Sequence, residues 1–148
     1  MSHLDKTQEW HDIVLFALHT GLRKSEIFNL KFSHIDFTAH FLKIVDTKTR
    51  RNRVVPLNQI CRNLLIEKII TSPDHFVFNK KSPKTFTMAI KLCGFNDNVT
   101  DRRHKVVFHS LRHTFASWLV QQDIHLSVIS RLLGHSDIQL TMRYAHLS

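Results

Sequence analysis

Glycine occurs only three times in this 148-residue chain, and each glycine follows a segment whose apolar residues recur at helical spacing. Gly21, Gly94 and Gly134 therefore fit the position just beyond a helix, where positive φ is favoured. With three prolines, the turn residues are too few for a strongly β-rich fold. These features predict a helix-rich protein, and the length is that of one domain.

Two short β-prone runs interrupt the helical pattern. FLKIVD, residues 41–46, and RVVPL, residues 53–57, flank the basic turn TKTRRN, which is typical of a hairpin. HFVF, residues 75–78, predicts a brief further strand, and the polar residues 96–105 predict an exposed loop. The predicted fold class is mainly α (α+β), with a small antiparallel sheet. Helices are expected over residues 5–20, 23–30, 58–70, 84–93, 109–122 and 126–133, and in a last segment.

The last predicted helix carries the only tyrosine of the chain. Ser136-Asp137-Ile138-Gln139 matches a capping box, with Ser136 as N-cap and Gln139 reaching back to it. A helix that starts there would place Tyr144 about two turns along. Chance packing of an aromatic residue on the core is one interpretation of this tyrosine. A phenol that takes part in chemistry is the other.

The charge of the chain restricts its partners. Lysine and arginine total 21 against 12 acidic residues, which gives a net charge of +9. A basic surface of this size indicates a polyanion, with nucleic acid first, although a surface that only confers solubility has the same charge. Cys61 and Cys93 show no CxxC spacing, and the apolar run from Ile13 to Leu18 is too short to span a membrane. We expect a cytoplasmic protein without a disulfide framework.

Several basic residues occupy positions that suit a phosphate. His109 and Arg112 lie three residues apart on one helix face, where the planar guanidinium can bind two phosphate oxygens. Arg23 opens a helix just after Gly21, and helix N-termini favour anions. Each has a simpler interpretation: solvated side chains for the first pair, and an ion pair with Glu26 for Arg23.

The predicted hairpin turn carries four cations in six residues, from Lys48 to Arg53. Such a turn suits contact with DNA, and a lysine among other cations could donate a proton. A solvated basic turn is the alternative. His135 follows Gly134, where it could also cap the preceding helix. His109 and His113 are spaced like metal ligands, but HExxH is absent, so we expect His113 to satisfy a local hydrogen bond.

Four segments together resemble the tyrosine recombinase, or phage integrase, family. They are TGLRKSEIFNL, TKTRRNRVVPL, HSLRHTFASWLV and LLGHSDIQLTMRYAH, in the order of that family. The resemblance implies an integrase-like DNA breaking-rejoining fold. It also implies a site-specific recombinase that cuts and rejoins double-stranded DNA through a covalent 3′-phosphotyrosine, without metal, ATP or another cofactor.

The resemblance assigns roles to single residues. Arg23 and Arg112 match the two arginines with which the family binds the phosphate, and His109 and His135 match its two histidines. Lys48 matches the lysine that acts as the general acid, and Tyr144 matches the nucleophile. Glu26 and His113 match positions that support the site. Further DNA contacts are expected from the basic residues Arg50, Arg51, Arg53, Lys80, Lys81, Lys84, Arg102 and Arg103.

Family members usually carry an N-terminal core-binding domain. We therefore expect residues 1–148 to be a single catalytic domain, with the core-binding domain absent from this chain. A tetramer on DNA is expected in the full-length protein and a monomer for the isolated domain, encoded by a prokaryote or phage. Two alternatives stay open: a non-catalytic, basic DNA-binding remnant of an integrase, and a hydrolase with a histidine-bound metal.

Overall fold

The computed structural model describes residues 3–45, 52–68, 73–79 and 83–147. The first half of the chain contains α1 (His3–Thr20), α2 (Lys24–Phe28), β1 (Ile35–Asp36), β2 (Phe41–Val45), β3 (Asn52–Pro56) and α3 (Gln59–Ile66). The second half contains α4 (Pro83–Leu92), α5 (Phe108–Gln121), α6 (Leu126–Leu133) and α7 (Gln139–Met142). Short 3₁₀ helices span Phe32–His34, Arg102–His104 and Ala145–Leu147. The predicted fold class, mainly α with a small antiparallel sheet, is confirmed.

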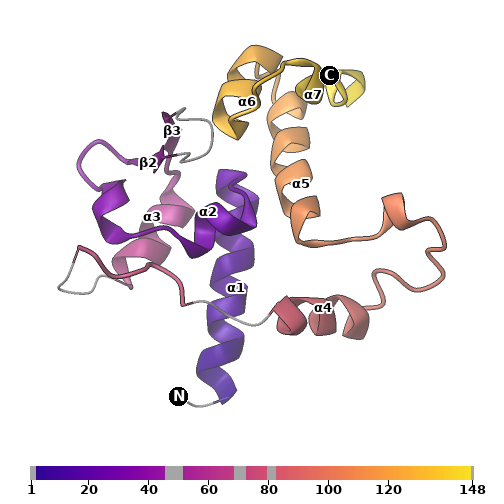
Figure 1. Ribbon diagram of the computed structural model, residues 1–148, viewed down its shortest axis with the longest axis horizontal. Coiled ribbons are helices and arrows are strands. Elements are labelled where there is room, and N and C mark those ends of the chain that lie inside the picture. Colours follow the sequence, from indigo (N-terminus) through magenta and orange to yellow (C-terminus); the bar gives the residue numbers. More distant parts are fainter. Residues whose placement is uncertain (1–2, 46–51, 69–72, 80–82, 148) are drawn as a thin grey trace.

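α1 forms the centre of the domain and packs against α3 on one side and α5 on the other (Figure 1). Its residues Ile13, Phe16 and Ala17, spaced three and four apart, are almost completely buried. They share one hydrophobic core with the sheet and α3. A second, smaller core joins α5 and α6 to the C-terminal segment, and it contains Tyr144.

The register of the sheet determines where Arg53 points. β2 and β3 are antiparallel, with Leu42 opposite Val55 and Ile44 opposite Arg53. Alternate residues of a strand share a face, so Arg53 projects on the same side as the buried Val55. This side faces the body of the protein and brings β3 into contact with α6. The turn between the two strands, which includes Lys48, lies outside the described residues.

The glycines lie just beyond helices, as predicted. Gly21, Gly94 and Gly134 all have positive φ, between 63° and 68°, and they follow α1, α4 and α6. A Cβ atom on Gly134 would lie 2.9 Å from Nη1 of Arg53, so both the backbone and the surroundings disfavour a side chain. A Cβ atom on Gly21 would overlap the ring of Phe115.

The prediction for the last helix is wrong. α7 begins at Gln139 rather than Ser136 and ends at Met142. The carboxylate of Asp137, and not the hydroxyl of Ser136, accepts the Gln139 N–H, at 2.9 Å. An ionised acceptor makes the stronger hydrogen bond, which explains this choice. Tyr144 therefore lies beyond α7, in the turn before the last 3₁₀ helix.

Two further differences are local. Residues 75–78 form no regular strand, and Phe76 makes an isolated β-bridge with Lys31. The predicted loop over residues 96–105 contains the 3₁₀ helix Arg102–His104. In the part of the chain that the structure describes, no helix has the length and apolar character needed to cross a membrane.

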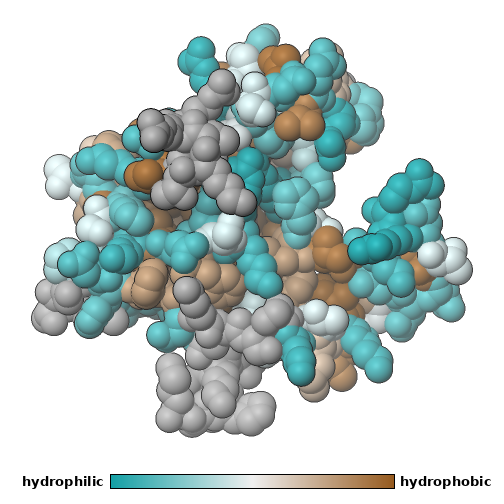
Figure 2. Space-filling model, viewed as in Figure 1, coloured by the Kyte–Doolittle hydropathy of each residue, from teal (hydrophilic) through white to brown (hydrophobic). Residues whose placement is uncertain are grey.

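Apolar side chains are exposed around α4. Met88 and Leu92 on α4, and Phe95 just beyond its end, are 63%, 81% and 59% exposed. Figure 2 shows hydrophobic side chains gathered near α4.

Candidate active site

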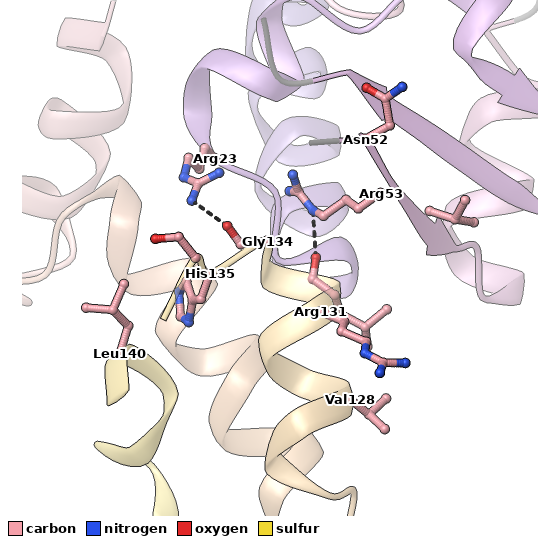
Figure 3. A pocket seen from close by; sticks show the side chains of 11 residues that line it. Arg23, Asn52, Arg53, Val128, Arg131, Gly134, His135 and Leu140 are labelled. Atoms are coloured by element: carbon pink, nitrogen blue, oxygen red, sulfur yellow. Dashed lines mark hydrogen bonds between the residues drawn. The ribbon is translucent and has the colours of Figure 1, made fainter. Parts of the chain in front are cut away.

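Three consecutive backbone carbonyls at the end of α6 each accept a hydrogen bond from a different arginine. The pairs are Leu132 with Arg53, Leu133 with Arg112, and Gly134 with Arg23. Figure 3 shows the first and the last of these bonds, which measure 2.8 Å and 3.2 Å. The last carbonyls of a helix lack partners within it and carry the negative end of its dipole, so they attract cations. We call these three arginines with their carbonyls the arginine junction.

The junction connects parts of the chain that are distant in sequence. Arg23 precedes α2, Arg53 lies on β3, and Arg112 lies on α5. The residue that follows the third carbonyl is His135, so the junction also fixes the position of this histidine. A cavity of about 570 Å³ adjoins the junction, and both Arg23 and His135 line it (Figure 3).

Glu26 is the anion that holds two of these arginines together. Its carboxylate accepts hydrogen bonds from both Nη groups of Arg53 at 2.8 Å. It also accepts the backbone N–H of Arg23 at 2.7 Å and Nη1 of Arg23 at 3.1 Å. Burial raises the pKa of Glu26, but the bonds from Arg53 and Arg23 outweigh burial and leave this pKa below its ordinary value. Glu26 is therefore ionised at neutral pH.

Arg53 does not occupy the position that we predicted for a DNA contact. Its side chain is 10% exposed, and its Nε and both Nη groups bond to Leu132 and Glu26. The alternation of side chains on β3 turns Arg53 inward, where a carboxylate and a helix end satisfy its guanidinium. Its place is inside the arginine junction. The hairpin strand is thereby attached to α2 and α6.

Arg112 is almost completely buried, at 3% exposure. Besides the Leu133 carbonyl, it binds the Gly21 carbonyl through Nη1 at 2.8 Å. Burial, followed by repulsion from Arg23, lowers the pKa of Arg112 to about 10, which leaves the group charged at pH 7. These bonds use two of the five N–H groups of the guanidinium, which can present its remaining donors to an anion.

Three histidines surround the junction. The rings of His109 and His113 on α5 meet edge to face, with centroids 4.7 Å apart. His135 bonds through Nδ1 to the hydroxyl of Thr141 at 2.8 Å. Burial, followed by repulsion from Arg112, lowers the pKa of His109 and lowers the pKa of His135 to about 4. Burial and then His109 lower the pKa of His113, so all three imidazoles are neutral at pH 7.

Tyr144 is 6% exposed and packs in the second core. Its hydroxyl is hydrogen-bonded to Nδ1 of His113, so the partner of His113 is 31 residues away and not the local group that we predicted. Burial raises the pKa of Tyr144, and the neighbouring guanidinium groups of Arg143 and Arg112 offset part of this effect. The phenol is therefore neutral at pH 7, and it needs help to act as a nucleophile.

Five of the six predicted catalytic residues lie around the end of α6 and the adjoining face of α5. They are Arg23, His109, Arg112, His135 and Tyr144. Five of the predicted catalytic or DNA-binding residues lie outside the described ranges: Lys48, Arg50, Arg51, Lys80 and Lys81. The remaining predicted DNA contacts are Lys84 on α4, and Arg102 and Arg103 on the 3₁₀ helix that projects beside α5 (Figure 1). Their contact with DNA stays a prediction.

Sequence reasoning missed two residues of the site. Arg143 lies close enough to affect the pKa of Tyr144, and its position next to the tyrosine was the available signal. Thr141 is fully buried and binds His135, a contact that no local pattern indicates. Among the residues that the structure describes, no three His, Cys, Asp or Glu side chains are arranged to hold a metal ion.

A helical domain with a small antiparallel sheet, and with arginines, histidines and a buried tyrosine at one helix end, has the architecture of an integrase catalytic domain. The fold matches the catalytic domain of bacteriophage HP1 integrase with a TM-score of 0.72 at 25% identity, over 100% of this chain and 87% of that one. It matches the Tn1549 transposon integrase with a TM-score of 0.75 at 20% identity, over 93% of this chain and 55% of that one.

The sequence matches the family model described as the phage integrase family over residues 2–148, and the chain belongs to that family. It is 34% identical to a tyrosine recombinase of Pseudothermotoga lettingae, over 96% of this chain and 51% of the relative. It is 33% identical to the tyrosine recombinase XerA of Pyrococcus furiosus, over 92% and 49%. The chain thus spans about half the length of the curated relatives that it matches. The predicted family resemblance is confirmed.

Proposed function

We propose that this chain is the catalytic domain of a site-specific DNA recombinase that cuts and rejoins strands through Tyr144. The observation that carries the proposal is a neutral, buried phenol close to the guanidinium group of Arg112. The end of α6 holds that guanidinium group in place together with the one of Arg23. Phosphoryl transfer depends on positioning and on fixed positive charge more than on covalent chemistry by the protein. Membership of the phage integrase family supports the proposal.

In the proposed reaction, the Tyr144 oxygen attacks the phosphorus atom of a DNA phosphodiester. A bond forms between that oxygen and phosphorus, and the bond to the 5′-oxygen breaks with its electron pair. The 5′-oxygen takes a proton, for which Lys48 is our candidate donor. Arg23 and Arg112 stabilise the negative charge that develops at the phosphate, an effect worth about 10²–10³ in rate per donor.

The neutral histidines complete the proposed phosphate site. His109 and His135 can each donate one N–H to a non-bridging phosphate oxygen without repelling the two arginines as strongly as imidazolium groups would. The product is a 3′-phosphotyrosine and a free 5′-hydroxyl. The covalent bond conserves the energy of the phosphodiester, so attack by a 5′-hydroxyl of the same or another strand can rejoin DNA without a cofactor.

The proposed substrate is double-stranded DNA. The Tn1549 integrase structure contains circular intermediate DNA, and a XerH recombinase structure contains its difH substrate. The net charge of +9 suits such a polyanion. We propose that the full-length protein assembles as a tetramer on DNA and acts in the cytoplasm of a prokaryotic cell, where its substrate is found.

A covalent-trapping assay tests the proposal. The protein is mixed with supercoiled plasmid at low salt in EDTA, quenched with SDS, and analysed for relaxed DNA and protein-linked strands. We expect an adduct with the wild-type chain and none with Tyr144→Phe, which keeps the ring but lacks the attacking oxygen. DNA affinity, measured in parallel, should be nearly equal for the two proteins.

The other outcomes identify the alternatives. The chain is tested alone and with an N-terminal DNA-clamping domain fused to it. If both forms bind DNA in a salt-sensitive way and neither forms an adduct, the result would favour a non-catalytic DNA-binding module. Cleavage that EDTA abolishes would favour metal-dependent hydrolysis. An adduct that persists in Tyr144→Phe would show that another residue is the nucleophile.

A further inference from the structure

The Tyr144 hydroxyl has a specific partner, His113, which is not one of the groups proposed to bind the phosphate. Nδ1 of His113 is in hydrogen-bond contact with the Tyr144 oxygen, and the two ring centroids are 5.8 Å apart. His113 lies on α5, one turn after His109, and the tyrosine comes from the C-terminal segment. The contact therefore joins α5, the helix that carries Arg112, to the segment that carries the nucleophile.

Among the described residues, the other two imidazoles of the site are placed differently. His135 bonds to the Thr141 hydroxyl, and His109 contacts the ring of His113 edge to face. A general base must lie within hydrogen-bond reach of the proton that it removes. In this structure His113 meets that requirement for Tyr144.

The surroundings keep His113 in the form that accepts a proton. Burial, then His109, Arg143 and Arg112, lower its pKa, and these groups and Tyr144 are the titratable side chains that face it from α5 and from the C-terminal segment. The imidazole is neutral at pH 7. In the tautomer with hydrogen on Nε2, Nδ1 is an acceptor for the phenol proton.

We propose that His113 is the general base of the cleavage step and accepts the Tyr144 proton at Nδ1. The inference rests on the proposed recombinase function. As the bond between the Tyr144 oxygen and phosphorus forms, the phenol becomes acidic, and its proton passes to His113, which becomes an imidazolium. The 5′-oxygen leaves with the electron pair of the broken bond and is protonated by a separate acid. During rejoining, the imidazolium returns its proton to the phenolic oxygen as that oxygen leaves phosphorus.

The test uses the fact that the chain contains one tyrosine. Expression with difluorotyrosine, fluorinated at both ring positions beside the hydroxyl, acidifies the nucleophile and changes no other tyrosine. Cleavage rates are measured by single-turnover adduct formation for wild type and His113→Ala, each with tyrosine and with difluorotyrosine. With tyrosine, we expect His113→Ala to lower the rate by about 10²-fold or more. With difluorotyrosine, this deficit should shrink, because an acidic phenol needs less help from a base.

Two further variants separate proton transfer from positioning. His113→Asn can place its amide oxygen near the position of Nδ1 and accept the phenol hydrogen bond, but it does not take up the proton. We expect it to stay slow with tyrosine and to gain rate with difluorotyrosine. His75→Ala changes an exposed histidine outside the site and should cleave at the wild-type rate, both with tyrosine and with difluorotyrosine at position 144. Comparing the two tyrosines within one variant cancels any loss of folded protein.

The outcomes distinguish this inference from the proposed function. Two outcomes would overturn the role of His113 while the recombinase proposal stands. One is cleavage at the wild-type rate by His113→Ala or His113→Asn. The other is a rate deficit that is equal with tyrosine and with difluorotyrosine. Absence of an adduct from the wild-type chain, also with a fused DNA-clamping domain, would overturn both. A deficit that difluorotyrosine reduces in both variants supports proton transfer to His113.

Discussion

At the scale of single residues, the site depends on guanidinium groups that have two tasks. Arg112 binds two carbonyls, of Gly21 and Leu133, through separate nitrogens, and in the proposed reaction it also faces a phosphate. Only a planar fork with several N–H groups in fixed directions can do both. The same bonds that hold α1, α5 and α6 together therefore orient the charge for chemistry.

Arg112→Lys tests this double role. One ammonium group cannot reach both carbonyls and an anion, so we expect the free energy of unfolding to fall by about 1–3 kcal/mol, the cost of a buried unsatisfied polar group. Adduct formation should fall by about 10²-fold or more, because the phosphate loses an oriented donor. Urea denaturation and covalent trapping measure the two effects, with Arg62→Lys on α3, outside the site, as the control. Cleavage by Arg112→Lys close to that of the control would contradict the arrangement that we propose.

The sequence predicted individual site residues better than their contacts. Arg23, His109, Arg112 and His135 were selected because four motifs occur together in the order of the family. The local pattern of each residue alone also allowed a simpler interpretation. The bond between His113 and Tyr144 spans 31 residues, and the bond from Arg53 to Leu132 spans 79. Such pairs depend on how helices and strands pack, which no local pattern contains.

At the scale of elements, the end of α6 is the structural centre of the site. Helices were predicted well because apolar spacing and terminal glycines are local signals. The short α7 was predicted poorly, because Asp137 and not Ser136 accepts the first free N–H, and the two adjacent polar residues cannot be ranked by pattern alone. The consequence is functional, since Tyr144 lies in a turn beyond α7 and not within a regular helix.

Gly134→Ala tests whether the end of α6 supports activity as well as stability. Positive φ alone should cost about 1–2 kcal/mol for a residue with a side chain. At Gly134 the new Cβ would also lie 2.9 Å from Nη1 of Arg53, so the arginine junction must shift. Gly94→Ala is the matched control, because Gly94 has the same positive φ, and the neighbour there is the carboxylate end of Asp97.

Both glycine variants should lose similar backbone stability in urea denaturation. Only Gly134→Ala should also lower the rate of adduct formation, since it displaces Arg53 and the adjacent His135. An equal effect of the two substitutions on the cleavage rate would show that the junction does not position the site.

At the scale of the whole molecule, the excess of basic residues suits the binding of an anion such as DNA. The chain carries a net charge of +9, and burial, followed by repulsion from neighbouring basic groups, lowers the pKa of the three histidines of the site. A DNA phosphate bound by His109 and His135 would raise the pKa of these two imidazoles, because an anion favours their protonated form, whereas His113 faces Tyr144. The protein alone and the protein on DNA should therefore respond to pH in opposite directions.

Stability without DNA should fall as the pH is lowered from 6.5 toward 4. In this range the unfolded chain binds protons at His109, His113 and His135, whose ordinary pKa is 6.5, whereas the folded protein resists protonation, with the pKa of His135 at about 4. The free energy of unfolding therefore decreases with falling pH. Glu26, whose pKa is lowered from 4.5, adds to the loss only near and below that value, so the interval from pH 6.5 to 5 reports on the histidines.

Urea denaturation between pH 6.5 and 5 measures how the free energy of unfolding depends on pH. The proteins compared are wild type, His135→Gln and the exposed control His75→Gln. The curve for His135→Gln should be flatter than the other two, because its unfolded state gains no proton at position 135. Calorimetric titration with DNA in buffers of different ionisation enthalpy should show proton uptake on binding over the same interval, and affinity should rise as the pH falls. Stability that is constant between pH 6.5 and 5 would contradict the lowered pKa values of these histidines. Proton release on binding DNA would contradict a phosphate that raises the pKa of His109 and His135.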